Sequence, residues 1–370
     1  MNKLLSLILT FLSLSTALQA AAKAKPLPFE KEYRVVLMLP FCIGMPEETK
    51  KREVMAQYYE GVEMAIKELE AMGMKMNLIV LDTRQDSLEV IRLLSDPEMQ
   101  KSDLIIGPVY DNELVEVEKF CATYKIPLVS PLRYVPNTFG ADFPLINCNP
   151  ADSLLYFYTG KNAATGFKNF QAIVVDETGL GISASGARNF KKGFEAAGGK
   201  SVKIIDGKSQ TPSMFWNGKD SLLIFYTGKS ASCSNNGISN KTNGMWLIMG
   251  PAEWLNIDRM NYNSLNGIYF YDSYFINNSD SSYKVLRKNY RENYGGEPDR
   301  YTIIAYDQFQ FFCLALMCWD SEFYNKITEK EFDYTHRTFQ FVKRGNLIEN
   351  AGLNFFYYDN YNFYRANWRY

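Results

Sequence analysis

Residues 103–131 read DLIIGPVYDNELVEVEKFCATYKIPLVSP, and this stretch decides the fold. The short apolar runs at 104–106 and 126–129 are typical of buried strands, and Gly107-Pro108 stops the first of them. Residues 113–124, between the two runs, have a helical pattern. A strand, a helix and a second strand in this order predict a right-handed crossover within a parallel sheet.

The same alternation of strands and helices continues on both sides of this stretch. Upstream, strand-type runs at 35–39 and 78–81 flank a helical segment at 52–72, whose apolar residues recur every three or four positions. Downstream, we expect strands at 144–149, 172–175, 202–205, 222–226, 246–249 and 267–271, and helices at 153–164, 183–197, 282–294 and 303–319. The C-terminus predicts a hairpin from 354–358 and 361–368.

These elements predict an α/β fold with two Rossmann-like lobes, each built on a parallel sheet that helices cover. The predicted lobes comprise 33–148 plus 273–325 and 149–272 plus 326–370. Without residues 1–22 about 350 residues remain, which is enough for two hydrophobic cores.

The N-terminus has the order of a secretory signal peptide. Lys3 supplies a basic start, 4–18 is an apolar run, and the small residues at 20–22 fit a cleavage site after Ala20 or Ala22, of which Ala22 is favoured. The apolar run is shorter than the roughly 20 residues of a spanning helix. No cysteine precedes Cys42, so a lipid-attachment cysteine is not expected. The sequence therefore predicts a periplasmic protein that is not embedded in a membrane.

Composition and charge exclude several classes of partner. Apolar residues make up 46% of the chain and charged residues 22%, as in ordinary globular proteins. The formal net charge is −1, so no basic surplus indicates nucleic acid and no polybasic cluster indicates an anionic membrane.

The sequence offers little for catalysis or metal binding. The six cysteines are dispersed without a CxxC pair, and their disulfide pairing is left open. His336 is the only histidine, which excludes a His-rich metal site, and no GxSxG, HExxH or P-loop motif occurs. A glycine pattern at 179–184 loosely matches a dinucleotide fingerprint, but three residues separate it from the preceding strand. We therefore expect no enzyme activity, no cofactor and no metal.

Several segments match signatures that occur in one known family. These are YYEGVEMAIKELEAMG (58–73), LIVLDT (78–83), DLIIGPVY (103–110), KIPLVSP (125–131), AIVVDETGLG (172–181), FKKGFEAAGGKSV (190–202) and YTIIAYDQFQFFCLAL (301–316). Together they resemble the type I periplasmic binding proteins, specifically the branched-chain amino-acid (Leu-Ile-Val-binding) group. The resemblance implies two lobes that are joined by a hinge of three crossovers and close on a ligand in the cleft between them.

The resemblance also implies where the ligand binds, namely at the loops that follow the carboxyl ends of the strands. The candidate ligand-binding residues are Tyr110, Asp111, Ser130, Arg133, Tyr134, Thr178, Gly179, Glu253 and Trp254. Arg133 can hold a carboxylate or phosphate, or else pair with a nearby acid on the surface. Glu253 can accept an ammonium group or simply begin a helix. The three aromatic candidates can stack on a ligand or serve ordinary packing.

Departures from the family pattern weaken the prediction of an amino-acid ligand. Tyr110-Asp111-Asn112 and Leu132-Arg133-Tyr134 stand where the amino-acid binders usually have small hydroxyl residues. The stretch 207–221 is also short for the helix that the family places there. We therefore expect a solute-binding protein for a small polar or amino-acid-like ligand, with an ABC importer or an envelope protein as partner. The alternative is a ligand-free or ligand-sensing regulatory or scaffold module of the cell envelope.

Overall fold

The computed structural model describes residues 31–136, 144–178, 180, 185–228, 246–256, 268–278, 280–334, 336–359 and 362–366. Two compact units result, one formed by 1–149 with 278–352 and the other by 150–277 with 353–370. The chain passes between them three times, after Asn149, after Asn277 and after Gly352. The predicted signal peptide lies outside the described residues.

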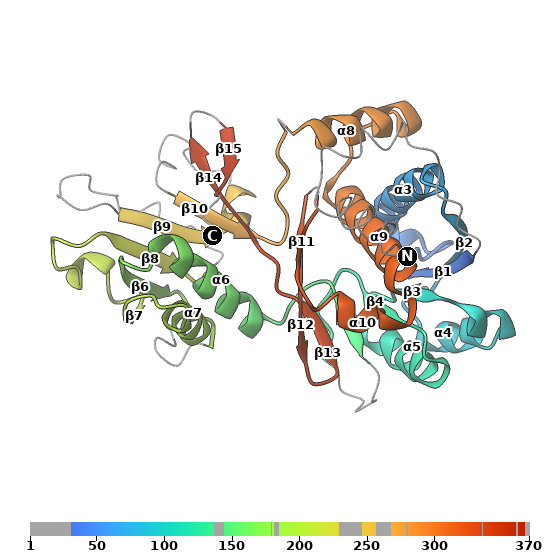
Figure 1. The fold of residues 1–370 in the computed structure, drawn as a ribbon, viewed down its shortest axis with the longest axis horizontal. Helices are drawn as coiled ribbons and strands as arrows, with labels where there is room; N and C mark the ends of the chain where they lie inside the picture. The colour runs from blue at the N-terminus through green and yellow to red at the C-terminus, as the bar shows by residue number, and fades with distance from the viewer. Residues whose placement is uncertain are drawn as a thin grey trace. The chain divides into compact units, whose positions relative to one another are not determined.

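The first unit contains an eight-stranded sheet in the order β11-β12-β13-β5-β4-β3-β1-β2 (Figure 1). Its strands are β1 (Glu32–Leu39), β2 (Lys75–Asp82), β3 (Leu104–Ile106), β4 (Leu128–Ser130), β5 (Leu145–Asn147), β11 (Glu331–Asp333), β12 (Thr338–Arg344) and β13 (Leu347–Asn350). The strands β1 to β5 pair in parallel, as the alternation of strands and helices predicts.

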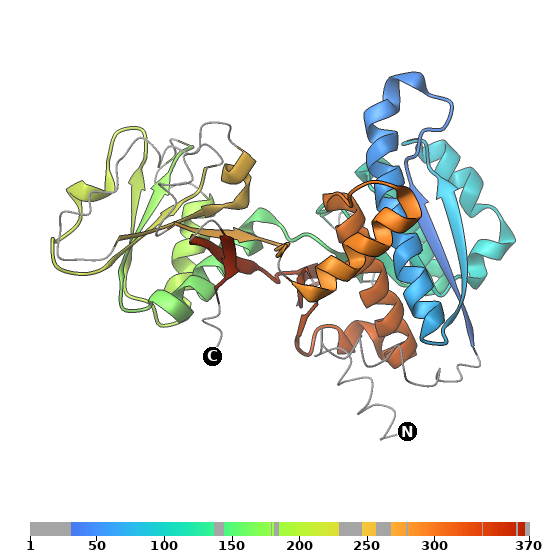
Figure 2. The same cartoon turned by 90° about the horizontal axis from the view of Figure 1, so that it is seen from above.

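Helices cover both faces of this sheet (Figure 2). They are α3 (Thr49–Ala71), α4 (Ser87–Leu94), α5 (Asp111–Tyr124), α8 (Ser281–Tyr294), α9 (Arg300–Trp319) and α10 (Phe323–Lys326), with short 3-10 turns η1 (Pro46–Glu48), η2 (Pro97–Lys101) and η8 (Asp320–Glu322). On one face, Val90 of α4 and Val117 of α5 pack against Val36 and Ile105 of the sheet. Helix α3 packs against α9, because Gly61 lets the backbone of α3 approach Thr302 closely.

Helix α9 is long and apolar enough to cross a membrane by length and composition, alone among the helices that the structure describes. Of that stretch, 78% is buried inside the protein. Its apolar character therefore fits the central helix of the first unit, and it agrees with the helix predicted at 303–319.

The second unit contains a seven-stranded sheet in the order β15-β14-β10-β9-β8-β6-β7. Its strands are β6 (Gln171–Asp176), β7 (Val202–Asp206), β8 (Leu222–Tyr226), β9 (Trp246–Pro251), β10 (Ile268–Asp272), β14 (Asn354–Asp359) and β15 (Asn362–Arg365). The strands β6 to β10 are parallel. The predicted C-terminal hairpin is confirmed, since β14 and β15 pair antiparallel with Tyr357 opposite Tyr364.

The two faces of the second sheet are covered unequally. Helices α6 (Asp152–Phe167) and α7 (Ser185–Ala196) pack on one face, where Phe190 and Phe194 meet Phe225 and Leu223. The described elements on the other face are only the short turns η4 (Pro212–Met214) and η6 (Ala252–Asn256). The structure therefore bears out the expectation that 207–221 is too short for a long helix.

The division of the chain after residue 325 needs a correction. The sequence placed all of 326–370 in the second lobe, but 326–352 belongs to the first unit. The reason is a hairpin of β12 and β13 that the sequence analysis missed. It joins the first sheet because Ile348 of β13 lies opposite Ile146 of β5 in a parallel pair.

Candidate functional site

In each sheet there is one strand at which the strand order changes direction, so that the connections on its two sides run to opposite sides. In the first unit β1 lies between β2 and β3, and in the second unit β6 lies between β7 and β8. Loops at the carboxyl ends of such strands diverge, and open parallel sheets bind their ligands there. The residues that follow β1 to β4 and β6 to β9 are therefore the candidates in each unit.

The first unit presents an aromatic ring with two cations at this edge. Tyr110 follows β3, precedes α5 and is half-buried. Arg133 Cζ lies 5.6 Å from the centre of the Tyr110 ring, and Lys51 Nζ lies 5.5 Å from it, so both are attracted to its π-electrons. Lys51 is also paired with Glu48 at 2.8 Å. The exposed guanidinium of Arg133, in contrast, makes no hydrogen bond or ion pair with any residue that the structure describes.

The other predicted residues of the first unit have different roles. Ser130 is buried at the end of β4, and its hydroxyl donates to the carbonyl oxygen of Arg133 at 2.9 Å. This hydrogen bond stabilises the turn that carries Arg133. Asp111 is exposed in the first turn of α5, where a negative charge stabilises the helix. Tyr134 is half-buried, and this burial raises the pKa of its phenol.

In the second unit the structure describes three of the four predicted residues. Gly179 lies outside the described residues. Thr178 is exposed, but its hydroxyl lies 2.8 and 2.9 Å from the two carboxylate oxygens of Asp176 and donates to that carboxylate. Glu253 is exposed in η6, the turn that follows β9.

Trp254 is a residue of the hydrophobic core. Its side chain is fully buried, and its ring packs edge-on against Tyr226 with the ring centres 5.7 Å apart. The indole N–H donates to the carbonyl oxygen of Gly228 at 3.1 Å. Of the two roles that the sequence left open for Trp254, stacking on a ligand and ordinary packing, the structure shows packing, because the ring already fills space against the sheet.

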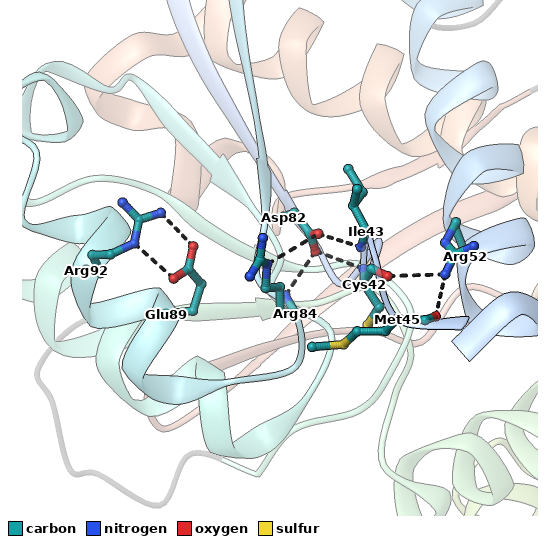
Figure 3. Close-up of polar contacts among 8 residues, drawn as sticks. All are labelled: Cys42, Ile43, Met45, Arg52, Asp82, Arg84, Glu89 and Arg92. Carbon is teal, nitrogen blue, oxygen red and sulfur yellow. Dashed lines mark hydrogen bonds and ion pairs between the residues drawn. The ribbon is translucent and has the colours of Figure 1, made fainter. Parts of the chain in front are cut away.

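A carboxylate that the sequence analysis did not single out organises the loop after β1. Asp82, the last residue of β2, accepts hydrogen bonds from three backbone N–H groups (Figure 3). The nitrogen atoms of Cys42 and Arg84 lie 3.0 Å from Asp82 Oδ1, and that of Ile43 lies 2.9 Å from Oδ2. Hydrogen bonds to a charged acceptor are about twice as strong as neutral ones.

The same loop is held on its other side by an arginine. The guanidinium of Arg52, in α3, donates to the carbonyl oxygens of Cys42 and Met45 (Figure 3). The loop after β1 is therefore fixed by a carboxylate on its N–H groups and a guanidinium on its C=O groups. The sequence signal for the first contact was an aspartate at the very end of a strand.

Glu113 is a second carboxylate that the sequence analysis missed. It lies in the first turn of α5 and its side chain is fully buried. Burial raises the pKa of Glu113 to about 7, although the nearby Thr83 hydroxyl, the Tyr110 backbone and the charge of Lys51 partly offset this effect.

The described residues include no group of three or more His, Cys, Asp or Glu side chains that could hold a metal ion. The cysteines that the structure describes, namely Cys42, Cys121, Cys148, Cys313 and Cys318, are unpaired. The described groups at the strand ends of the first unit are charged side chains, an aromatic ring and hydrogen-bonding groups.

Comparison with solved structures identifies the fold. A protein from Rhodospirillum rubrum described as a branched-chain amino acid ABC transporter is 13% identical, with a TM-score of 0.61 over 91% of this chain and 100% of the other. An ABC transporter substrate-binding protein from Desulfitobacterium hafniense, in complex with Leu, is 14% identical, with a TM-score of 0.53 over 91% and 100%.

A third similar structure has a regulatory role. The C-domain of LpoA from Haemophilus influenzae, a regulator of PBP1A, is 13% identical, with a TM-score of 0.58 over 90% of this chain and 99% of the other. No family model matches the chain. No curated protein matches it either. The chain has the type I periplasmic-binding-protein fold, as its sequence signatures predicted.

Proposed function

We propose that this chain is an exported, periplasmic solute-binding protein that captures a small polar or amino-acid-like ligand and catalyses no reaction. Two proteins of the same fold carry the name of ABC transporter components, and one of them was crystallised with Leu. The proposal adds delivery of the ligand to an ABC importer. The apolar segment at 4–18 supports export, and the N-terminal sequence of the mature protein tests cleavage after Ala22.

The exposed guanidinium of Arg133 carries the proposal. It stands at the carboxyl end of β4, beside Tyr110 at the end of β3, and has no acidic partner among the described residues. A guanidinium that is not neutralised by a neighbouring acid can hold a carboxylate or phosphate through two parallel hydrogen bonds. The Tyr110 ring beside it offers a flat surface for the rest of the ligand.

Thermal unfolding with a panel of amino acids, organic acids, peptides, nucleotides and sugars tests this function. A ligand at 100 times its dissociation constant should stabilise the protein by about 2.7 kcal/mol. Arg133→Gln should weaken binding of the ligand found at least about tenfold, because it removes the charge that holds the anionic group.

The matched control for Arg133→Gln is Arg92→Gln. Arg92 is an exposed arginine in the last turn of α4 and is paired with Glu89 at 2.6 Å. This variant should bind like the wild type. Equal affinity of the wild type and Arg133→Gln would show that Arg133 does not contact the ligand.

A second function, a regulatory or scaffold module of the envelope, is favoured by one observation. Backbone and hydroxyl donors at the strand ends of both units are already bound by the protein's own carboxylates, Asp82 and Asp176. The LpoA domain shows that this fold also occurs in a regulator of PBP1A. If no compound of the panel stabilises the protein, and a purified envelope protein binds it saturably, this second function replaces the first.

A further inference from the structure

We propose that Asp82 is a specificity-determining residue, because its carboxylate fills the backbone anion site of the loop after β1. The ligand of the first unit then carries a neutral or cationic group at this loop, and its anionic group lies at Arg133. This inference rests on the proposed function and adds the ligand class to it.

The loop after β1 has the conformation of an anion-binding turn. Cys42 has φ 52° and Gly44 has φ 83°, so both residues lie in the left-handed region. Successive backbone N–H groups in such turns point toward one another and bind anions. In this protein the N–H groups of Cys42 and Ile43 converge on the two oxygens of Asp82, as Figure 3 shows.

The position of this turn makes its occupant important for binding. It follows β1, the strand between β2 and β3, where the loops of an open parallel sheet receive a ligand. The side chain of Asp82 is 15% exposed, so its charge is only partly screened by water. A ligand carboxylate or phosphate at this turn would find three N–H donors already bound to Asp82. The negative charge of Asp82 would also repel it.

Two arginines lie beside this turn, and neither removes Asp82 from its backbone N–H donors. Arg84 Nε lies 4.0 Å from Asp82 Oδ2, and the Arg84 side chain is 51% exposed. Arg52 is directed to the carbonyl oxygens of the loop and not to Asp82. The Asp82 carboxylate therefore occupies the place of a ligand anion at the loop after β1, and Arg133 remains available to bind a ligand anion.

Replacing Asp82 with a small side chain should open the site to a free carboxylate. The probe is sodium acetate, and sodium chloride at equal ionic strength is the reference. Each salt is added separately to the chain without its predicted signal peptide. In Asp82→Ala, acetate should shift the backbone amide resonances of Cys42, Ile43 and Arg84 saturably and raise the melting temperature more than chloride does. Acetate should bind this variant at least about tenfold more tightly than the wild type.

Asp206→Ala is the matched control. Asp206 also ends a strand, β7, but its carboxylate accepts from one backbone N–H, that of Lys208 at 2.9 Å, and from the Ser209 hydroxyl at 3.0 Å. Acetate should raise the melting temperature of this variant no more than chloride does. If Asp82→Ala fails to fold, Asp82→Ser provides the folded sample, since its hydroxyl can accept one of the three N–H groups.

Two results would overturn the inference. One is a folded Asp82 variant whose Cys42, Ile43 and Arg84 amides respond to acetate no more than to chloride. The other is a wild type that binds acetate at these amides as tightly as the variant. Neither result depends on the ligand panel, so failure of this inference and failure of the proposed function are distinguishable.

Discussion

At the scale of single residues, the strand ends of the first unit combine charges in very different surroundings. Arg133 is exposed and lacks an acidic partner among the described residues, whereas Asp82 is bound to three backbone N–H groups. Glu113 lies fully buried in the first turn of the helix that Tyr110 precedes. Arginine, aspartate and glutamate usually lie on the surface, so the sequence alone would place all three side chains there. Their different environments depend on the neighbours that the fold brings to each of them.

Glu113→Gln should remove a pH dependence of the free energy of unfolding. The pKa of Glu113 is about 7 in the folded protein, against an ordinary value of 4.5. Below pH 4.5 the Glu113 carboxyl is protonated in both the folded and the unfolded state. Between pH 4.5 and pH 7 it is protonated only in the folded state, so the free energy of unfolding falls as pH rises through this range. At pH 8 the glutamine variant should therefore exceed the wild type by up to roughly 3 kcal/mol, and at pH 4.5 they should be equal.

Urea unfolding between pH 4.5 and pH 8 measures this difference. Glu116→Gln is the control on the same helix, because Glu116 is partly exposed and paired with Lys119. Its effect should stay within about 1 kcal/mol at every pH, as for other surface ion pairs. Parallel pH curves for the wild type and Glu113→Gln would contradict the prediction.

At the scale of elements, two helix pairs pack through glycines. In the second unit, a Cβ added at Gly193 of α7 would lie 1.9 Å from the carbonyl oxygen of Phe157, and one at Gly160 of α6 would lie 2.1 Å from that of Phe190. In the first unit, Gly61 of α3 makes the same kind of approach to Thr302. The close contact of each pair therefore requires the absence of a side chain.

Gly193→Ala should destabilise the protein by about 1–3 kcal/mol, because the methyl group forces α6 and α7 apart. Helix propensity alone predicts the opposite sign, a gain of up to about 1 kcal/mol for alanine over glycine. Chemical denaturation therefore decides between the two effects. Gly296→Ala is the control, since a Cβ there meets no atom within 4 Å and should change stability little. A stabilised Gly193→Ala variant would show that the helices do not touch at this position.

At the scale of the whole molecule, each unit has a core of its own. Phe312 is fully buried in the first unit, where its ring centre lies 5.8 Å from that of Phe341. Phe194 is fully buried in the second unit, where its ring stacks on Phe190 at 6.0 Å. Chains with two separate cores commonly unfold in more than one step.

Calorimetry should therefore resolve two unfolding transitions. Phe194→Ala and Phe312→Ala should each cost about 3–5 kcal/mol, and each should lower a different transition. The reason is that a cavity weakens the core in which it lies and leaves the other intact. A single transition, lowered equally by both substitutions, would show that the two units unfold together.

The sequence by itself determined the strand-and-helix order, the parallel sheets and the fold, because local periodicity records which face of each element is buried. It did not determine where the hairpin of β12 and β13 belongs. That depended on β13 pairing with β5, about 200 residues earlier in the chain. Nor did it determine that Trp254 lies in a core and that Asp82 fills a backbone anion site. Hydrogen-bond partners and burial are set by neighbours distant in sequence, so only the tertiary structure could decide them.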